Sequence, residues 1–283
     1  AQSGLTVVAT REPGEPLLPV VSGNVLIPPD ARLVAVRLKS AEWQERARGV
    51  KIYPVQPMRP LSQFNAIPFV PPQPSVYGSD AAYPAEVVTD VPAGSKAGFR
   101  IAGFLFCPFQ YYPASGRLLL ATRAELEVEY ENSAVPAMVL TPSQVEMTKE
   151  LVSPLVVNAQ DVSRWAPQSV EIDGAEMDVA IVTSSTLAPA LVGFRNYLRR
   201  KGYFAEIMPT ETVYARYPGR DNQEKIRNML KDKFAHQGLK YVILAGDVQH
   251  VPCRYGYLPY SPYNVPADLY FSDLDGSWDA NNN

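Results

Sequence analysis

The sequence predicts an antiparallel β-sandwich followed by an α/β three-layer domain with a parallel sheet. Residues 5–131 contain short β-branched and aromatic runs separated by turn signals, as in all-β domains. Residues 177–247 instead alternate apolar strands with amphipathic helices, as in α/β domains. The length of 283 residues also favours two domains over one. We place the domains at residues 1–134 and 178–283, with a linker at 135–177.

Composition excludes several classes of protein. The net charge is −3 with both signs spread along the chain, so there is no basic surface for nucleic acid. No apolar run reaches the ~18 residues of a membrane-spanning helix. The two cysteines, Cys107 and Cys253, fall in different predicted domains, which argues against a disulfide bridge. The start of the chain lacks the regions of a signal peptide and is compatible with the mature terminus of a secreted protein.

The predicted strands of the first domain cover residues 5–10, 24–28, 32–40, 50–55, 99–109 and 117–131. Turn signals such as "VSGN", "PASG" and "VPAGS" separate these runs. Within the last of them, apolar residues alternate with glutamates from residue 125 to 131, which predicts one face in water. Residues 54–74 contain seven prolines and therefore predict an extended surface crossover. This crossover is either a rigid connection or a strap along a partner surface, with Arg59 or Phe64 as its anchor.

The linker contains one predicted helix over residues 141–152. Thr141 is its expected N-cap, Pro142 takes the first helical position, and Gln144 completes a capping box. The rest of the linker reads as irregular chain, in which Arg164 is a conceivable target for cleavage between the domains.

The second domain has the predicted order β-α-β-α-β. Its strands cover residues 177–184, 203–210 and 240–247, and its helices cover residues 185–202 and 221–238. Such an order gives a parallel sheet, and ligands of these sheets bind beyond the carboxyl ends of the strands. Here those ends are residues 183–185, residues 210–212, and Gly246 with Asp247.

Known nucleotide, hydrolase and zinc motifs do not occur. The first strand is followed by no glycine-rich turn, the chain has no G-x-S-x-G, and its histidines and cysteines lack zinc spacing. His250 and Cys253 lie close in sequence, but catalytic pairs normally come from separate segments. The ordinary interpretation is a loop cysteine beside a surface histidine. His236 falls in the last turn of a helix, where the helix dipole accounts for it.

The acidic segment at residues 268–281 is the clearest chemical signal. Its hard oxygen donors surround Gly276 and are the kind that Ca²⁺ prefers. The candidate ligands are Asp268, Asp273, Asp275, Asp279 and Asn281. The spacing is not that of an EF-hand, and a solvated acidic turn is the alternative. Because the sequence ends inside this segment, we expect a longer protein of which this is the front part.

Four segments together resemble the gingipain-like cysteine peptidases of family C25. They are "VTSSTLAPALVGFRNYLRRKGYFAEI", "YPGRDNQEKIRNMLKDKF", "YVILAGDVQHVPCRY" and "ADLYFSDLDGSWDANN". The front half is similar to the family's pro-domain in "GEPLLPVVSGNVLIP" and "FCPFQYYPASGRLLLATRAELEVEYE". The resemblance implies a caspase-like fold for the second domain. It also implies a pro-domain that assists folding and blocks the cleft until it is cleaved.

The resemblance further implies peptide-bond hydrolysis by a Cys/His dyad, yet the chain contains no His-Gly pair of the family type. We therefore assign no catalytic residue and expect the dyad beyond residue 283, in a downstream peptidase subdomain that is this chain's partner. This chain alone should be inactive, and the family's substrate specificity is not transferred. The alternative is a non-catalytic member that acts as a surface binding, adhesion or secretion module. A calcium-stabilised structural domain is compatible with both.

Overall fold

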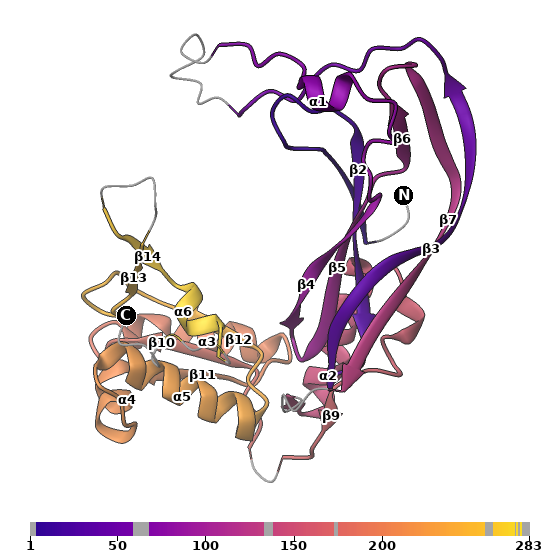
Figure 1. Ribbon diagram of the computed structural model, residues 1–283. Coiled ribbons are helices and arrows are strands. Elements are labelled where there is room, and N and C mark those ends of the chain that lie inside the picture. Colours follow the sequence, from indigo (N-terminus) through magenta and orange to yellow (C-terminus); the bar gives the residue numbers. More distant parts are fainter. Residues whose placement is uncertain are drawn as a thin grey trace. The chain divides into compact units, whose positions relative to one another are not determined.

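The computed structural model describes residues 4–58, 68–132, 138–172, 175–257, 263–274, 276 and 278. The chain divides into two compact units, shown in Figure 1. We call residues 1–138 with 147–167 the β-rich unit, and residues 139–146 with 168–283 the α/β unit. The segment expected to be a linker is thus shared, because residues 139–146 join one unit and residues 147–167 the other.

The β-rich unit contains two antiparallel sheets. One has the strand order β1-β2-β5-β4 and the other the order β3-β7-β6. The strands of the first sheet are β1 (Leu5–Ala9), β2 (Pro19–Ile27), β4 (Val88–Lys96) and β5 (Phe99–Phe106). Those of the second are β3 (Ala31–Ala47), β6 (Phe109–Tyr112) and β7 (Arg117–Asn132). A short helix, α1 (Pro74–Tyr77), follows the proline-rich crossover.

Apolar residues of the two sheets share one core. Val25, Ile27 and Ala102 of the first sheet pack with Ala31 and Val128 of the second. Because side chains alternate along a strand, each sheet offers one such face to the other.

Residues 147–167 belong to the β-rich unit because their apolar side chains complete a second core there. Val152, Val156 and Val162 pack against Leu26 of β2 and Phe99 of β5.

The side chain of Asn158 strengthens this attachment. Its Oδ1 accepts from the Leu26 N–H at 2.8 Å and its Nδ2 donates to the Leu26 carbonyl at 3.1 Å. The amide therefore pairs with β2 as a neighbouring strand would.

Four predictions for this half were wrong, and proline or edge position explains three of them. The expected turn "VSGN" instead continues β2, where Ser22 and Gly23 pair with strands on both sides. Residues 50–55 form only an isolated bridge between Pro16 and Pro54, because Pro54 has no N–H to donate. The strand expected over residues 99–109 ends before Pro108 and resumes as β6. The expected turn "VPAGS" lies inside β4, an edge strand that accommodates Pro92 at a bulge. The crossover anchors, Arg59 and Phe64, lie outside the described residues.

Gly23 provides a test of sheet packing. A Cβ at this position would press against the Phe104 ring and lie 2.8 Å from Leu5 Cδ2, so Gly23→Ala should cost about 1–3 kcal/mol of unfolding free energy. Gly94→Ala is the matched control in the same sheet, because a Cβ added there would meet no atom within 4 Å. Urea unfolding of both variants measures the difference. Equal effects would show that the space above Gly23 is not filled.

The α/β unit is built on a three-stranded parallel sheet with the order β11-β10-β12. Its main elements are β10 (Val179–Thr183), α3 (Ala188–Arg200), β11 (Ala205–Pro209), α4 (Thr210–Arg216), α5 (Asn222–Gln237) and β12 (Tyr241–Leu244). The smaller ones are β8 (Val139–Leu140), β9 (Gln168–Ser169), β13 (Arg254–Gly256), β14 (Val265–Ala267) and α6 (Leu269–Ser272). The helix α2 (Pro142–Val152) begins in this unit and ends in the β-rich unit, followed by 3₁₀ turns at Ser153–Leu155 and Ala159–Asp161.

The central strand β10 is buried on both faces. Ala180 and Val182 face a core that contains Met229 of α5, whereas Val179 and Ile181 face a core completed by α3. The predicted parallel pairing of these strands is confirmed.

Two details of this unit differ from prediction. The strand expected to be buried over residues 240–247 is the sheet edge β12, where Tyr241 is 47% exposed and Val242 is 37% exposed. The helix α4 was not predicted at all, because "TETVYAR" is too short to show helical periodicity.

Both predicted capping devices are present. Thr141 Oγ1 accepts from the Gln144 N–H at 3.3 Å, and Gln144 Oε1 accepts from the Thr141 N–H at 2.8 Å. Asp221 accepts from the Glu224 N–H at 2.9 Å, and Gly238 ends α5 with a φ of 71°. Among the described residues, every helix is too short or too polar to cross a bilayer.

Candidate functional site

The carboxyl edge of the parallel sheet gathers hydroxyl groups around His250. Ser184 Oγ lies 2.9 Å from His250 Nδ1, and Thr210 Oγ1 donates to the His250 carbonyl at 3.3 Å. Thr183 Oγ1 donates to the Ala245 carbonyl at 2.7 Å. Ser184 is only 6% exposed and Thr183 is fully buried, so these groups brace the loop after β12 rather than face a ligand.

Glu211 and Asp247 are the exposed acids of this edge. Glu211 Oε2 accepts from the Ser185 hydroxyl at 2.7 Å and from its N–H at 2.8 Å. The Ser185 hydroxyl bond in particular holds the pKa of Glu211 below its ordinary value. Asp247 Oδ1 accepts from the Gln249 N–H at 3.0 Å, a local turn contact. Asp247 therefore has a structural partner within this turn.

Neither cysteine has the surroundings of a nucleophile. Cys107 and Cys253 are both free and buried. Burial raises the pKa of the Cys107 thiol, which disfavours the reactive thiolate. His250 directs Nδ1 to Ser184, while His236 Nδ1 lies 3.0 Å from Asp232 Oδ1 within α5.

Only part of the acidic segment lies within the described residues. Asp268 and Asp273 are described, whereas Asp275, Asp279 and Asn281 lie outside. Asp273 Oδ2 accepts from Trp278 Nε1 at 2.6 Å. Within the described chain, no group of three or more His, Cys, Asp or Glu residues is close enough to hold a metal ion.

Arg227 organises this segment, and sequence reasoning missed it. Its guanidinium donates to the backbone carbonyls of Tyr270 at 3.1 Å, Gly276 at 2.8 Å, and Asp273. Arg227 is 2% exposed, although arginine is seldom fully buried without partners. In the sequence, the position of Arg227 directly after Ile226, on the apolar stripe of α5, was the one indication that this arginine is buried.

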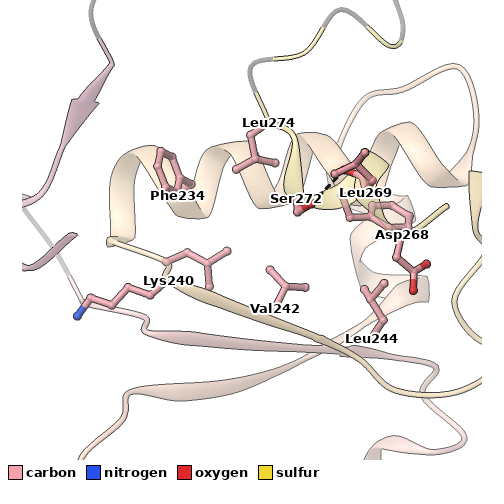
Figure 2. A pocket seen from close by; sticks show the side chains of 10 residues that line it. Phe234, Lys240, Val242, Leu244, Asp268, Leu269, Ser272 and Leu274 are labelled. Carbon is pink, nitrogen blue, oxygen red and sulfur yellow. Dashed lines mark hydrogen bonds between the residues drawn. The ribbon is translucent and has the colours of Figure 1, made fainter. Parts of the chain in front are cut away.

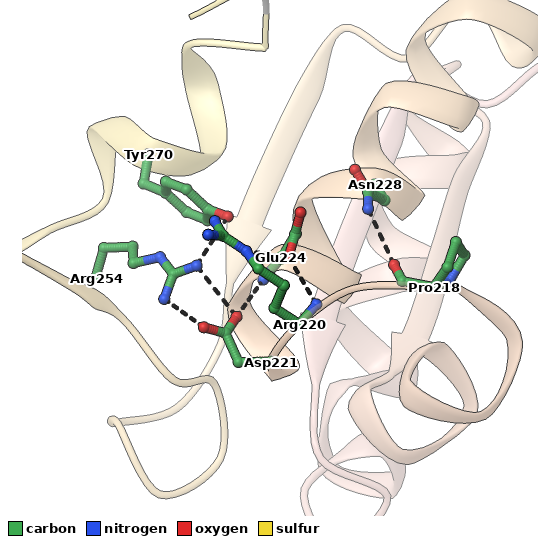
Figure 3. A network of polar contacts seen from close by, with 7 residues as sticks. All are labelled: Pro218, Arg220, Asp221, Glu224, Asn228, Arg254 and Tyr270. Atoms are coloured by element: carbon green, nitrogen blue, oxygen red, sulfur yellow. Dashed lines mark hydrogen bonds and ion pairs between the residues drawn. The ribbon is translucent and has the colours of Figure 1, made fainter. Parts of the chain in front are cut away.

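A second arginine joins β13 to the start of α5. Arg254 donates to Asp221 Oδ2 at 2.6 Å and to Oδ1 at 3.1 Å, as Figure 3 shows. It also lies over the Tyr270 ring, 4.7 Å from the centroid, and Arg227 lies 5.2 Å from the same centroid. Tyr270 is fully buried, and both guanidinium groups contact its ring. Two cation–π contacts and a bidentate ion pair thus fix the start of the acidic segment.

The Asp221–Arg254 pair predicts a dependence of stability on pH. Burial alone would raise the pKa of Asp221, but hydrogen bonds from Arg254 and the Glu224 N–H lower it below its ordinary 3.8. The stabilisation is present above pH 3.8 and is lost as the pH falls through the lowered folded-state value. Asp221→Asn should cost about 0.5–1 kcal/mol at pH 7, because asparagine still caps the helix and the pair is partly exposed.

Denaturant unfolding at several pH values tests this. The deficit of Asp221→Asn should shrink as the pH falls below 3.8. Asp90→Asn, an exposed change on β4, is the control and should show little deficit at any pH. A deficit that stays constant into acid would contradict the role of the carboxylate charge.

A largely apolar groove of about 680 Å³ runs beside the edge strand β12, as Figure 2 shows. Its lining residues are Phe234, Leu239, Lys240, Val242, Leu244, Asp268, Leu269, Phe271, Ser272 and Leu274. The Asp268 carboxylate points toward the Leu244 end, and Lys240 lies at the opposite end. Lys240 Nζ is paired with Asp178 Oδ1 at 2.7 Å. The residues between the two ends are largely apolar, so the middle of the groove offers apolar contacts.

Arg164 lies in the segment attached to the β-rich unit. Its exposed guanidinium lies 5.8 Å from the centroid of the Trp165 ring, and Trp165 packs against the Leu26 core.

Comparison with known proteins identifies two regions. The family model Propeptide_C25 matches residues 3–146, more than half of the chain, and the model of peptidase family C25 matches residues 172–282. A structure of gingipain K from Porphyromonas gingivalis, from a study of zymogenic latency, is 27% identical with a TM-score of 0.39. It covers 45% of this chain and 71% of that chain. A complex of Porphyromonas gingivalis RgpB pro- and mature domains is 20% identical with a TM-score of 0.43, covering 56% of this chain and 88% of that one. No curated protein is significantly similar to this chain.

Proposed function

Because the chain belongs to peptidase family C25 and carries its propeptide ahead of a peptidase region, we propose that it is the N-terminal part of a secreted cysteine endopeptidase precursor. The β-rich unit acts as a pro-domain that assists folding and blocks the cleft. The observation that carries this proposal is the order of the two family matches along one chain.

The catalytic Cys and His lie after residue 283, and the described region supports the peptidase unit. Three observations support this placement: both cysteines are buried, His250 is engaged by Ser184, and His236 is engaged by Asp232. The two antiparallel sheets form a β-sandwich, and the parallel sheet belongs to a caspase-like three-layer domain. The core shared by the two sheets and the helices packed against both faces of β10 favour these assignments.

The groove beside β12 is the surface that binds the remainder of the peptidase unit. The half-exposed Tyr241 and Val242 and the 61% exposed Leu269 favour an apolar partner at this edge. In the full-length protein, protein or peptide substrates bind after this unit is complete and the pro-domain has been cleaved.

Ca²⁺ stabilises the acidic segment through Asp268, Asp273, Asp275, Asp279 and Asn281. Asp273 keeps one carboxylate oxygen beyond its bond to Trp278, and oxygen donors of this kind suit Ca²⁺. Arg227 already occupies two loop carbonyls, so the side chains supply the ligands. Saturating Ca²⁺ should raise the melting temperature of the protein, and a chelator should reverse the rise. An unchanged melting temperature in saturating Ca²⁺ would reject this site.

C-terminal peptide sequencing and the intact mass of the natural protein test the proposed enzyme. A continuation with a His-Gly pair and a later Cys supports the zymogen. A continuation without them leaves the same fold as a surface binding, adhesion or secretion module. As a second check, purified chain 1–283 should show no thiol-dependent peptide hydrolysis. Activity of this chain would contradict a dyad that lies after residue 283.

A further inference from the structure

The peptide bond after Arg164 lies in a turn, although the Arg164 side chain is exposed. The N–H of this bond, which belongs to Trp165, donates to the Asp161 carbonyl at 2.9 Å. The Arg164 guanidinium lies 5.8 Å from the centroid of the Trp165 ring. Proteases bind the residues around the bond that they cut as an extended strand, so they favour exposed, unstructured chain. The turn must therefore unwind before a protease can bind this bond.

Apolar residues on both sides of the bond belong to the core around Leu26. Val162, before the bond, is 5% exposed and packs in this core. After the bond, Trp165 and Ala166 pack against the same core. An extended conformation around Arg164 would withdraw these side chains from the core and expose apolar surface to water.

Hydrogen bonds upstream of the turn hold the same segment to β2. The Val157 N–H donates to the Asn24 carbonyl at 2.9 Å. The Asn158 amide pairs with the backbone of Leu26, and its Nδ2 also donates to Asp161 Oδ2 at 3.0 Å. Asn158 therefore connects β2 to the turn that contains the bond.

We propose that residues 153–167 restrict cleavage after Arg164, so that the bond is cut only in a minor state in which this segment has detached from β2 and β5. The rate of cleavage then follows the population of the open state when reclosing is fast. Hydrolysis adds one water across the bond, leaving a carboxylate on Arg164 and an amino group on Trp165. The restriction governs maturation only if the proposed function holds, because there this cleavage begins removal of the pro-domain. The protection of the bond is a property of the β-rich unit itself.

Trypsin, which cuts after arginine and lysine, tests the proposal on the intact chain 1–283. Mass spectrometry follows the initial appearance of fragments that end at Arg164, and a synthetic peptide of residues 155–172 gives the rate for the same bond without the fold. The folded chain should be cut at least about a hundredfold more slowly than the peptide. Hydrogen exchange of the Trp165 amide in the unaltered protein should show protection of similar size, since both rates report the same opening.

Asn158→Ala should raise the rate of cleavage after Arg164 by about tenfold, because it removes both hydrogen bonds to the Leu26 backbone. Exchange of the Trp165 amide should accelerate by the same factor. Position 158 is about 20 Å from the bond along an extended chain, beyond the residues that trypsin contacts. Ser163→Ala, an exposed change beside the bond, is the matched control and should leave both rates unchanged relative to a peptide with the same change.

A third variant separates local opening from global unfolding. Tyr111→Phe removes the hydrogen bond from the buried Tyr111 hydroxyl to the Val50 carbonyl, 2.9 Å long, in a different core of the same unit. It lowers the global stability without altering residues 153–167, so cleavage after Arg164 should keep its original rate.

Three results would overturn the proposal: a folded chain cut as fast as the peptide, no response to Asn158→Ala, or equal acceleration by Asn158→Ala and Tyr111→Phe. A natural protein without the His-Gly pair rejects the proposed enzyme and leaves these rates unchanged, so the two proposals fail independently.

Discussion

Replacing Arg227 by methionine should lower the free energy of unfolding by about 3–4 kcal/mol, because three backbone carbonyls would lose their donor in a buried site. Methionine has a similar length and fills much of the volume, so the loss reports the hydrogen bonds and the contact with Tyr270 rather than a cavity. The acidic segment should also loosen, since Asp273 and Gly276 are held by the same guanidinium.

Two measurements separate these effects. Urea unfolding gives the stability, and hydrogen exchange of the Trp278 indole N–H reports the segment directly through its bond to Asp273. The control is Arg195→Met on α3, a partly exposed arginine bonded only to Asn196 among the contacts described, which should change stability by less than about 0.5 kcal/mol. Similar losses for both arginines, or unchanged exchange at Trp278, would show that Arg227 does not hold the segment.

Replacing Gln144 by methionine should cost about 2–4 kcal/mol. Gln144 is 1% exposed; its Oε1 accepts from the Thr141 N–H, and its Nε2 donates to the carbonyls of Phe234 at 3.2 Å and Leu239 at 2.9 Å. Methionine retains the volume but leaves one buried N–H and two carbonyls without this partner. The expected result is a large loss in unfolding free energy and earlier exchange of the Leu239 amide at the end of α5.

The matched control is Gln249→Met, an exposed glutamine in the loop after β12, which should be nearly neutral. A Glu at position 144 separates the two roles of the residue. It retains the carbonyl-type oxygen for the Thr141 N–H but brings no amide donor, so it should recover little stability. Full recovery by Gln144→Glu would mean that capping alone explains the residue.

Sequence reasoning worked where the signal was local. The capping box of Thr141 and Gln144, the N-cap Asp221 and the left-handed Gly238 depend on neighbouring residues, and all three lie as predicted. The order of strands and helices in the α/β unit followed from periodicity for the same reason.

The predictions that failed depend on contacts between residues that are far apart in the sequence. Whether Val242 is buried depends on which strand lies beside β12, and that neighbour is not encoded in the strand itself. Pro92 marked a turn in sequence, but an edge position lets β4 continue through it at a bulge. Arg227 serves residues 43 to 49 positions away, so no local pattern could reveal its partners.

The second role of Gln144 was invisible for the same reason, since its carbonyl partners lie about 90 positions later. The candidate calcium ligands share a short segment, so the sequence could propose them together. Their arrangement around an ion depends on backbone conformation, which spacing alone does not determine.

The short strands β8 and β9 change what a break in the chain at Arg164 would accomplish. Val139 and Leu140 pair with Gln168 and Ser169, so the break would fall in the loop between two paired strands of the α/β unit. The piece that ends at Arg164 would keep Gln144 inserted at the end of α5. Cleavage of this peptide bond would therefore not separate the two products. They should elute together in size-exclusion chromatography. Dissociation would need a second event that extracts residues 139–146 from the α/β unit.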